Sequence, residues 1–155
     1  MLKFPGRSSA PSSLHGNSLL AGLSARDLKI LEDLVHQRHY LADEIVFDEG
    51  EEGEALYLVV SGQVVICHPG KKLQPIATLG PGAFFGELAL LDNDVRAAEA
   101  RALAPAVLAV FFRGDFERLM ESHARIASLI AVQLARHLGR RLRTMVAASS
   151  EEESP

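Results

Sequence analysis

Residues 84–98, FFGELALLDNDVRAA, place two charged side chains on either side of a short apolar segment. Glu87 directly follows a glycine, and Arg96 lies nine residues further along the chain. The ELALL run between them favours a helix of about one turn, and the first N–H groups of a helix attract anions. A guanidinium binds phosphate oxygens in pairs, and the small residues Ala97 and Ala98 let an anion approach their N–H groups. This combination predicts a phosphate-binding site.

Glu87 must have another role, because a carboxylate repels a phosphate. It can accept a hydrogen bond from a sugar hydroxyl, and phosphate and sugar together indicate a nucleotide. On residue types alone a second interpretation stays open, in which Glu87 and Arg96 form an internal ion pair. Asp92, Asp94 and Glu99 add negative charge close to Arg96. They would weaken anion binding if they lay within a Debye length of about 8 Å and pointed toward the site.

The elements that position these residues fit one domain in a chain of 155 residues. Residues 1–18 are rich in Ser, Gly and Pro and are predicted to form a flexible arm, and residues 148–155 a disordered acidic tail. The domain is expected to span residues 19–147. It begins with a helix over residues 24–36, where Ser24 and Asp27 have the spacing of a capping box.

Residues 38–112 consist of short apolar or alternating runs separated by turn residues. The runs are EIVF, ALYLVV, QVVICH, LQPIATL, AEARAL and AVLAVFF. Ser61-Gly62 separates two of them as a tight hairpin would. The pattern predicts a mainly β fold, an antiparallel sandwich or barrel with flanking helices.

Two helices are expected after Gly114, a short one over DFERLMESH and a long one over residues 124–147. Apolar residues recur along the long helix every four positions, at Ile126, Ile130, Leu134, Leu138 and Leu142. This stripe can pack on the chain's own sheets or on a second subunit. Both can hold, each for one half of the helix.

The same stretch resembles the phosphate-binding cassette of cyclic nucleotide-binding domains. The family pattern Phe-Gly-Glu-Leu-Ala-Leu matches residues 85–90, and its Arg-Ala-Ala matches residues 96–98 at the family's spacing. IVFDEGEEGEALYLVVSGQV resembles the family's first hairpins, and the likeness covers roughly residues 20–145. The resemblance implies an antiparallel β-roll, or jelly roll, with an N-terminal helix, a short cassette helix and a long C-terminal lid helix.

The resemblance also implies a role for each matching residue. Arg96 would bind the cyclic phosphate with help from the N–H groups of Ala89, Ala97 and Ala98. Glu87 and Gly86 would hold the ribose 2′-hydroxyl. The cassette as a whole comprises Phe85, Gly86, Glu87, Leu88, Ala89, Arg96, Ala97 and Ala98, and the candidates for contacting the base are Ile66, Ile76, Leu138, Arg141 and Leu142.

Ala97 bears on the choice of ligand, because family members that take cyclic GMP often have threonine there. Arg141 could favour guanine by binding its O6 and N7 edge, but the alanine favours 3′,5′-cyclic AMP over cyclic GMP. The expected function is a stand-alone sensor that signals to a partner protein through its C-terminal helix and can form a homodimer through that helix. A nucleotide-free structural or dimerisation module and a cyclic dinucleotide receptor are the alternatives.

Other functional classes fit the sequence less well. Of the six histidines only His39 and His68 could lie on strands, so a metal-dependent barrel enzyme is disfavoured. No Gly-x-Ser-x-Gly or Gly-x-x-x-x-Gly-Lys motif occurs. We therefore expect no enzymatic activity, no metal and no cofactor beyond the nucleotide ligand.

Charge and cysteine content give further expectations. With a net charge of −4 and a pI near 5.8, the chain as a whole has no electrostatic reason to accumulate on nucleic acid or anionic lipid. The basic run from Arg136 to Arg143 complements a helix C-terminus. Cys67 is the only cysteine, which is typical of a reducing compartment, and no signal peptide or membrane span is recognised. We expect a cytoplasmic protein that binds neither DNA nor membranes.

Overall fold

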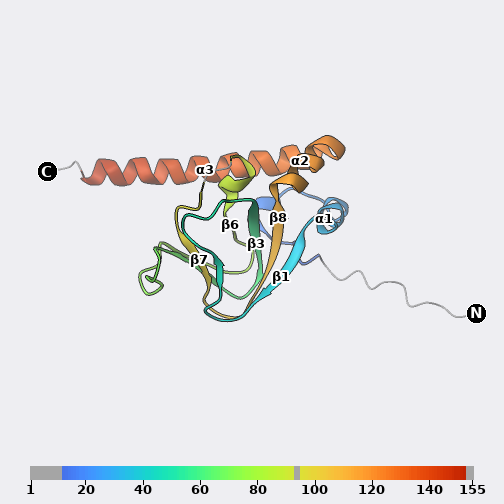
Figure 1. Ribbon diagram of the computed structural model, residues 1–155. Helices are drawn as coiled ribbons and strands as arrows, with labels where there is room; N and C mark the ends of the chain where they lie inside the picture. The colour runs from blue at the N-terminus through green and yellow to red at the C-terminus, as the bar shows by residue number, and fades with distance from the viewer. Residues whose placement is uncertain (1–11, 93–94, 153–155) are drawn as a thin grey trace, which may run out of the picture.

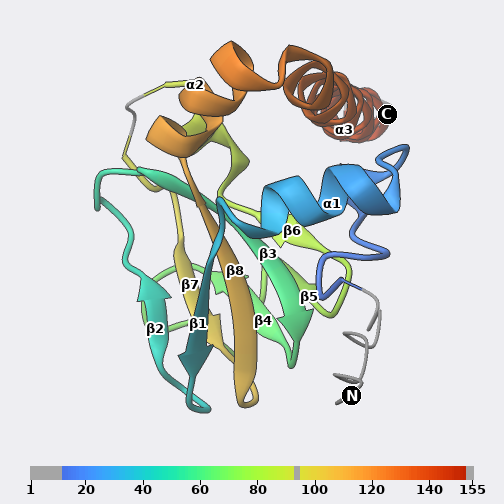
Figure 2. The same cartoon turned by 90° about the vertical axis from the view of Figure 1, so that its right-hand side faces the viewer.

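The computed structural model describes residues 12–92 and 95–152, and it contains two four-stranded antiparallel sheets. The strand orders are β1-β8-β3-β6 and β2-β7-β4-β5. The strands are β1 (His36–Tyr40), β2 (Ile45–Phe47), β3 (Ala55–Ser61), β4 (Val64–Cys67), β5 (Ala77–Leu79), β6 (Phe84–Phe85), β7 (Glu99–Ala102) and β8 (Ala106–Phe112). Helices cover one side of this β-roll (Figures 1 and 2). The predicted fold class is confirmed.

Successive strands mostly alternate between the two sheets, which corrects the expected hairpin at Ser61-Gly62. β3 and β4 belong to different sheets, so this turn carries the chain from one sheet to the other. Gly62 has a φ of +82°, and a Cβ there would lie 2.3 Å from the carbonyl oxygen of Pro105. Pro105 lies in the β7–β8 connection, which also changes sheets. Gly62 therefore lets two sheet-changing turns pack directly on each other.

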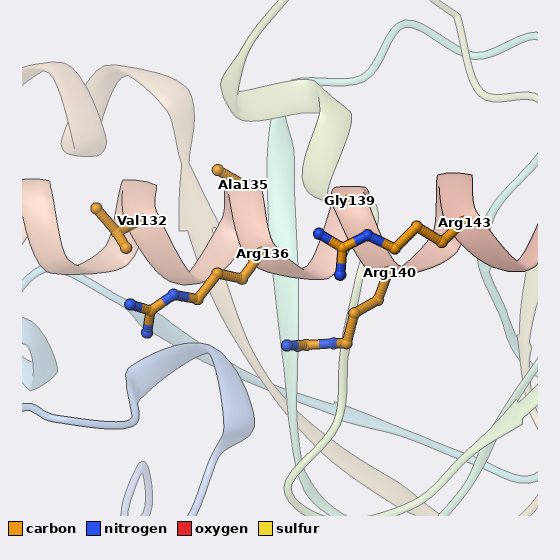
Figure 3. Close-up of a pocket in the computed structure, with 6 residues that line it drawn as sticks. All are labelled: Val132, Ala135, Arg136, Gly139, Arg140 and Arg143. Carbon is orange, nitrogen blue, oxygen red and sulfur yellow. The ribbon is translucent and has the colours of Figure 1, made fainter.

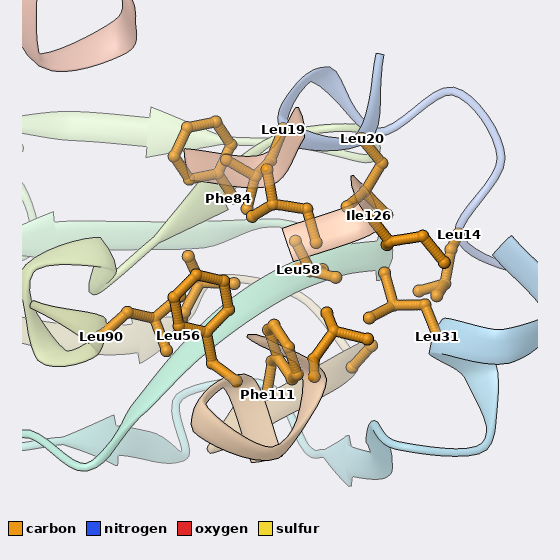
Figure 4. Close-up of a cluster of buried hydrophobic side chains, with 14 of the residues drawn as sticks. Leu14, Leu19, Leu20, Leu31, Leu56, Leu58, Phe84, Leu90, Phe111 and Ile126 are labelled. Atoms are coloured by element: carbon orange, nitrogen blue, oxygen red, sulfur yellow. The ribbon is translucent and has the colours of Figure 1, made fainter. Parts of the chain in front are cut away.

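β3 is buried on both faces because it separates two apolar clusters. Tyr57 and Val59 face the interior of the roll with Phe85 and Val110. On the other face of the same sheet lies the cluster under the helices, shown in Figure 4, which contains Leu14, Leu19, Leu31, Leu56, Leu58, Phe84, Phe111, Ile126, Ile130 and Leu134. A strand buried on both sides needs a continuous apolar run, which explains the ALYLV sequence.

The described N-terminal residues are part of the core, in contrast to the predicted arm that extends to residue 18. Leu14 is 1% exposed. Asn17 caps the short 3₁₀ helix η1 (Ser18–Leu20) through Leu19 N–H, and its Nδ2 donates to Ala83 O at 3.0 Å. Residues 1–11 of the predicted arm lie outside the described residues. The hydrogen bond from Asn17 to Ala83 O joins the start of the domain to the segment that leads into the cassette.

The first long helix, α1 (Ala25–Glu32), begins with the predicted capping box. Ser24 and Asp27 bond each other's backbone N–H groups. Asp27 also pairs with Arg125, which links α1 to the C-terminal helix. The helix ends earlier than expected, because residues from His36 onward form the edge strand β1.

The C-terminal helices are α2 (Arg113–Ser122) and α3 (Ala124–Glu152). Ile126, Ile130 and Leu134 are buried, Leu138 is half-buried, and residues 140–150 are exposed. The distal part of α3 projects beyond the β-roll (Figure 1). The expected disordered tail is therefore helical as far as residue 152, and residues 153–155 lie outside the described residues. No described helix is long and apolar enough to cross a bilayer.

Candidate functional site

The cassette begins where β6 ends, and an aromatic stack fixes its start. Phe85 pairs with Tyr57 across the sheet, and their rings stack with centroids 5.1 Å apart. Gly86 then adopts a left-handed conformation, with a φ of +73°, and caps the 3₁₀ helix η2 (Glu87–Leu90). The predicted one-turn helix is confirmed, in its tighter 3₁₀ form.

The side chain of Arg96 packs against Gly86, and Arg96 is 9% exposed. Its Nη1 donates to Gly86 O at 3.0 Å, and its Nη2 donates to Ala55 O at 2.6 Å. The guanidinium carbon lies 4.2 Å from the centroid of the Phe47 ring, a cation–π contact. Burial lowers the pKa of Arg96 from its ordinary value, but the pKa of arginine is so high that the group remains charged. A buried cation thus sits at the start of η2 and holds the backbone of the cassette.

Two glycines make room for this guanidinium. A Cβ on Gly53 would lie 3.2 Å from Arg96 Cζ, and a Cβ on Gly86 would lie 2.8 Å from Arg96 Nη1. The contact of Gly53 with Arg96 was not predicted from the sequence, where Gly53 falls only within the segment that resembles the family's first hairpins. The available signal was a glycine just before a buried strand, which often marks a close approach.

The amide groups near Arg96 differ in their availability. Ala89 N–H donates within the 3₁₀ turn to Gly86 O at 3.3 Å. Across the part of the chain that the structure describes, the N–H groups of Ala97 and Ala98 donate to no other backbone group. Ala97 is exposed and Ala98 half-buried. These two amides directly follow Arg96 in the chain, and successive backbone N–H groups without a backbone acceptor can bind an anion.

Of the three acidic residues close to Arg96 in the sequence, Glu99 has partners that offset its charge. Glu99 is 4% exposed, and its carboxylate accepts hydrogen bonds from Arg101 and from Cys67 Sγ. The Arg101 hydrogen bond lowers the pKa of Glu99, and burial raises the pKa of the Cys67 thiol. Asp92 is exposed, and Asp94 lies outside the described residues. The Glu99 charge is therefore offset locally by Arg101.

Glu87 is 6% exposed, and α3 supplies its charged partners. Glu87 Oε1 accepts a hydrogen bond from Arg141 Nη1 at 2.8 Å, and His137 Nε2 lies 3.5 Å from the same oxygen. A pair between Glu87 and Arg96 is not among the ion pairs of the described residues. The internal Glu87–Arg96 ion pair that the sequence left open is therefore not formed, and both charges have other partners.

Comparison with known proteins decides the family. The family model for the cyclic nucleotide-binding domain matches residues 37–123, more than half of the chain. The chain belongs to this family. A cyclic AMP receptor protein of Thermus thermophilus is 37% identical over 127 residues, covering 81% of this chain and 59% of the relative. A cGMP-dependent protein kinase of Drosophila melanogaster is 31% identical over 118 residues, covering 76% of this chain and 15% of the kinase.

A solved structure shows the same relationship. The crystal structure of the Thermus thermophilus catabolite activator protein has a TM-score of 0.76 and 35% identity, and the match covers 86% of this chain and 62% of that one. This cyclic nucleotide-binding domain therefore spans about three fifths of the Thermus receptor's length.

The residues expected to contact the base lie on two sides of the domain. Ile66 in β4 is half-buried against the inner cluster, and Ile76 is 56% exposed. They are neighbours, because Ile76 N–H donates to Ile66 O at 2.8 Å. On α3, Leu138 packs against the cluster under the helices, and Leu142 is 61% exposed. The remaining cassette side chain, Leu88, is 52% exposed.

The described cavities lie away from the cassette. A shallow one of about 450 Å³ runs along α3, where Arg136, Arg140 and Arg143 extend along the helix (Figure 3). A second, of about 270 Å³, lies against η1 and the start of α1. No group of three or more metal-ligating side chains is found among the described residues.

Proposed function

We propose that this cyclic nucleotide-binding domain is a sensor that binds 3′,5′-cyclic AMP in preference to cyclic GMP and catalyses no reaction. The observation that carries the proposal is the Arg96 guanidinium at Gly86, followed in the chain by the N–H groups of Ala97 and Ala98, which donate to no backbone group among the described residues. The hydrogen bonds to Gly86 O and Ala55 O occupy one N–H on each terminal nitrogen of Arg96. A guanidinium carries further N–H groups, and these can serve a cyclic phosphate.

The ribose and base contacts complete the proposed binding mode. Glu87, one residue along from Gly86, would accept the ribose 2′-hydroxyl with Gly86 beside it, and Phe85, Leu88 and Ala89 complete the cassette. The base would lie between the strand residues Ile66 and Ile76 and the helix residues Leu138, Arg141 and Leu142. The relatives described above include a cyclic AMP receptor protein and a cGMP-dependent protein kinase, so similarity does not favour either nucleotide. The proposed preference for cyclic AMP therefore rests on Ala97.

The proposed output is a change in the position of α3 that a partner protein reads. Residues 140–150 of α3 are exposed, including the apolar side chains of Leu142, Met145 and Val146. Apolar residues at helical spacing on a projecting helix favour a homodimer through α3. The buried free thiol of Cys67 suits a reducing cytoplasm.

Binding can be tested by a thermal shift followed by calorimetry. A ligand at about 100 times its Kd adds about 2.7 kcal/mol of stability. We expect a shift with cyclic AMP and a weaker one with cyclic GMP. No shift with either would favour the nucleotide-free structural module, and a shift with a cyclic dinucleotide alone would favour that receptor class.

The phosphate contact is tested by Arg96→Lys, which keeps the charge but loses the planar fork. We expect the affinity for cyclic AMP to fall by about 2 kcal/mol, or roughly thirtyfold. Arg143→Lys is the matched control, because Arg143 is exposed and has no ion-pair partner among the described residues. Unchanged affinity in a folded Arg96→Lys variant would refute the phosphate role.

A further inference from the structure

Among the described residues, the last hydrogen bond that joins α3 to the rest of the domain is the one to the carboxylate of Glu87. Leu134 is buried, Leu138 is half-buried, and every described side chain from residue 140 to residue 150 is exposed. Arg141 nevertheless reaches Glu87 Oε1 at 2.8 Å. One turn earlier, the His137 ring lies 4.6 Å from the ring of Phe84, centroid to centroid, and its Nε2 is 3.5 Å from the same Glu87 oxygen. Beyond this point the helix projects freely (Figure 1).

The two oxygens of Glu87 have different surroundings. Oε1 faces both α3 side chains, whereas Oε2 has no hydrogen-bond donor among the described residues. No buried side-chain oxygen or nitrogen of the described residues lacks a partner, so Oε2 must be accessible to solvent. A carboxylate can accept hydrogen bonds on both oxygens. A hydroxyl can therefore bind Oε2 without displacing Arg141.

We propose that Arg141, supported by His137, is a positioning residue that fixes Glu87 through Oε1 and presents Oε2 to the ribose 2′-hydroxyl. This inference rests on the proposed function, because it assumes a ribose at Glu87. Arg141 holds the carboxylate in one orientation through its hydrogen bond to Oε1. Because coupling between two binding events is reciprocal, ribose binding strengthens the attachment of α3 at Glu87 to the same extent.

The experiment compares cyclic AMP with 2′-deoxy cyclic AMP, which lacks the hydroxyl that Oε2 would bind. Calorimetry gives the Kd of each ligand for the wild type, Arg141→Ala, Arg141→Lys and the matched control Arg140→Ala. Arg140 is exposed on the same helix turn, and its side chain makes no hydrogen bond or ion pair among the described residues. Arg141 is 60% exposed, so its removal should leave the domain folded.

We expect the wild type to prefer cyclic AMP over the deoxy ligand by tenfold or more, on the order of a hydrogen bond to a charged group. Arg141→Ala should weaken cyclic AMP binding by about fivefold, as for a partly exposed ion pair, and leave the deoxy ligand unchanged. Arg141→Lys should restore part of the preference, and Arg140→Ala should alter neither Kd.

Three results would overturn the proposal. Equal weakening of both ligands by Arg141→Ala would mean that the charge of Arg141 acts on the phosphate and not through Glu87. Tighter cyclic AMP binding in that variant would mean that α3 competes with the ribose for Glu87. A wild type that binds neither ligand would refute the proposed function itself, and this result is recognisable before any variant is compared.

Discussion

Replacing Gly86 by alanine tests whether Arg96 holds the cassette backbone. Gly86 and Gly70 share a φ of +73°, so an alanine is equally strained at either position. An added Cβ at Gly86 would lie 2.8 Å from Arg96 Nη1, whereas nothing lies within 4 Å at Gly70. Only the Gly86→Ala variant must push the guanidinium aside, and Gly70→Ala is therefore its matched control.

The expected magnitudes follow from these contacts. Gly70→Ala should lower the free energy of unfolding by roughly 1 kcal/mol, the cost of a left-handed conformation for an L-residue. Gly86→Ala should lose about 1.5–3 kcal/mol more, because the hydrogen bond from the charged Arg96 to Gly86 O is disturbed. Its affinity for cyclic AMP should also fall, whereas that of Gly70→Ala should not.

Urea unfolding measures both losses, provided that the slope of free energy against urea is the same for each variant. Calorimetry with cyclic AMP gives the affinities. Equal losses of stability in the two variants, within about 0.5 kcal/mol, would refute the conclusion that Arg96 is fixed against Gly86. Such a result would mean that the guanidinium moves away at little cost.

Two further outcomes are expected. Hydrogen bonds from Arg125 and from Ser24 N–H hold the pKa of Asp27 below its ordinary value of 3.8, so this carboxylate stabilises the fold above about pH 4, and the stabilisation is lost as the pH falls toward the lowered pKa. Acid unfolding followed by circular dichroism should show a smaller loss of stability below pH 4 in Asp27→Asn than in the wild type. For the proposed dimer, Leu142→Gln removes a side chain that is 61% exposed, so it should raise the dimer dissociation constant in analytical ultracentrifugation and leave the monomer's unfolding unchanged. A wild type that is monomeric at all concentrations would contradict the homodimer.

Local patterns in the sequence predicted the elements that depend on local chemistry. The capping box at Ser24, the one-turn helix after Gly86 and the apolar run of β3 were all recognisable, because each depends on neighbouring residues. β1 was not recognised. Its sequence, HQRHY, is polar because the strand lies at the edge of its sheet and is mostly exposed.

Two other features were missed because they depend on contacts between distant residues, and a third was missed for a local reason. Ser61-Gly62 has the composition of a hairpin turn, and only the packing of Gly62 against Pro105 reveals that it joins two sheets. The Arg141–Glu87 pair joins residues 54 positions apart, on elements whose relative placement no local pattern contains. The helical end of α3 was missed because Ala, Ser and Glu were assigned to a tail, although no proline or glycine interrupts residues 140–152.

Arg96 and Arg141 bond neighbouring residues of the cassette, so a ligand that moves one of them would affect the position of α3. Arg96 bonds Gly86 O from inside the roll, and Arg141 bonds the next residue, Glu87, from α3. A cyclic phosphate that draws the Arg96 guanidinium toward itself would pull on the backbone between these two residues and so on the last attachment of α3. A ligand shifts a conformational equilibrium only by its difference in affinity for the two states. The Gly86–Glu87 peptide is where that difference would arise, because the proposed phosphate contact of Arg96 and the proposed ribose contact of Glu87 meet there.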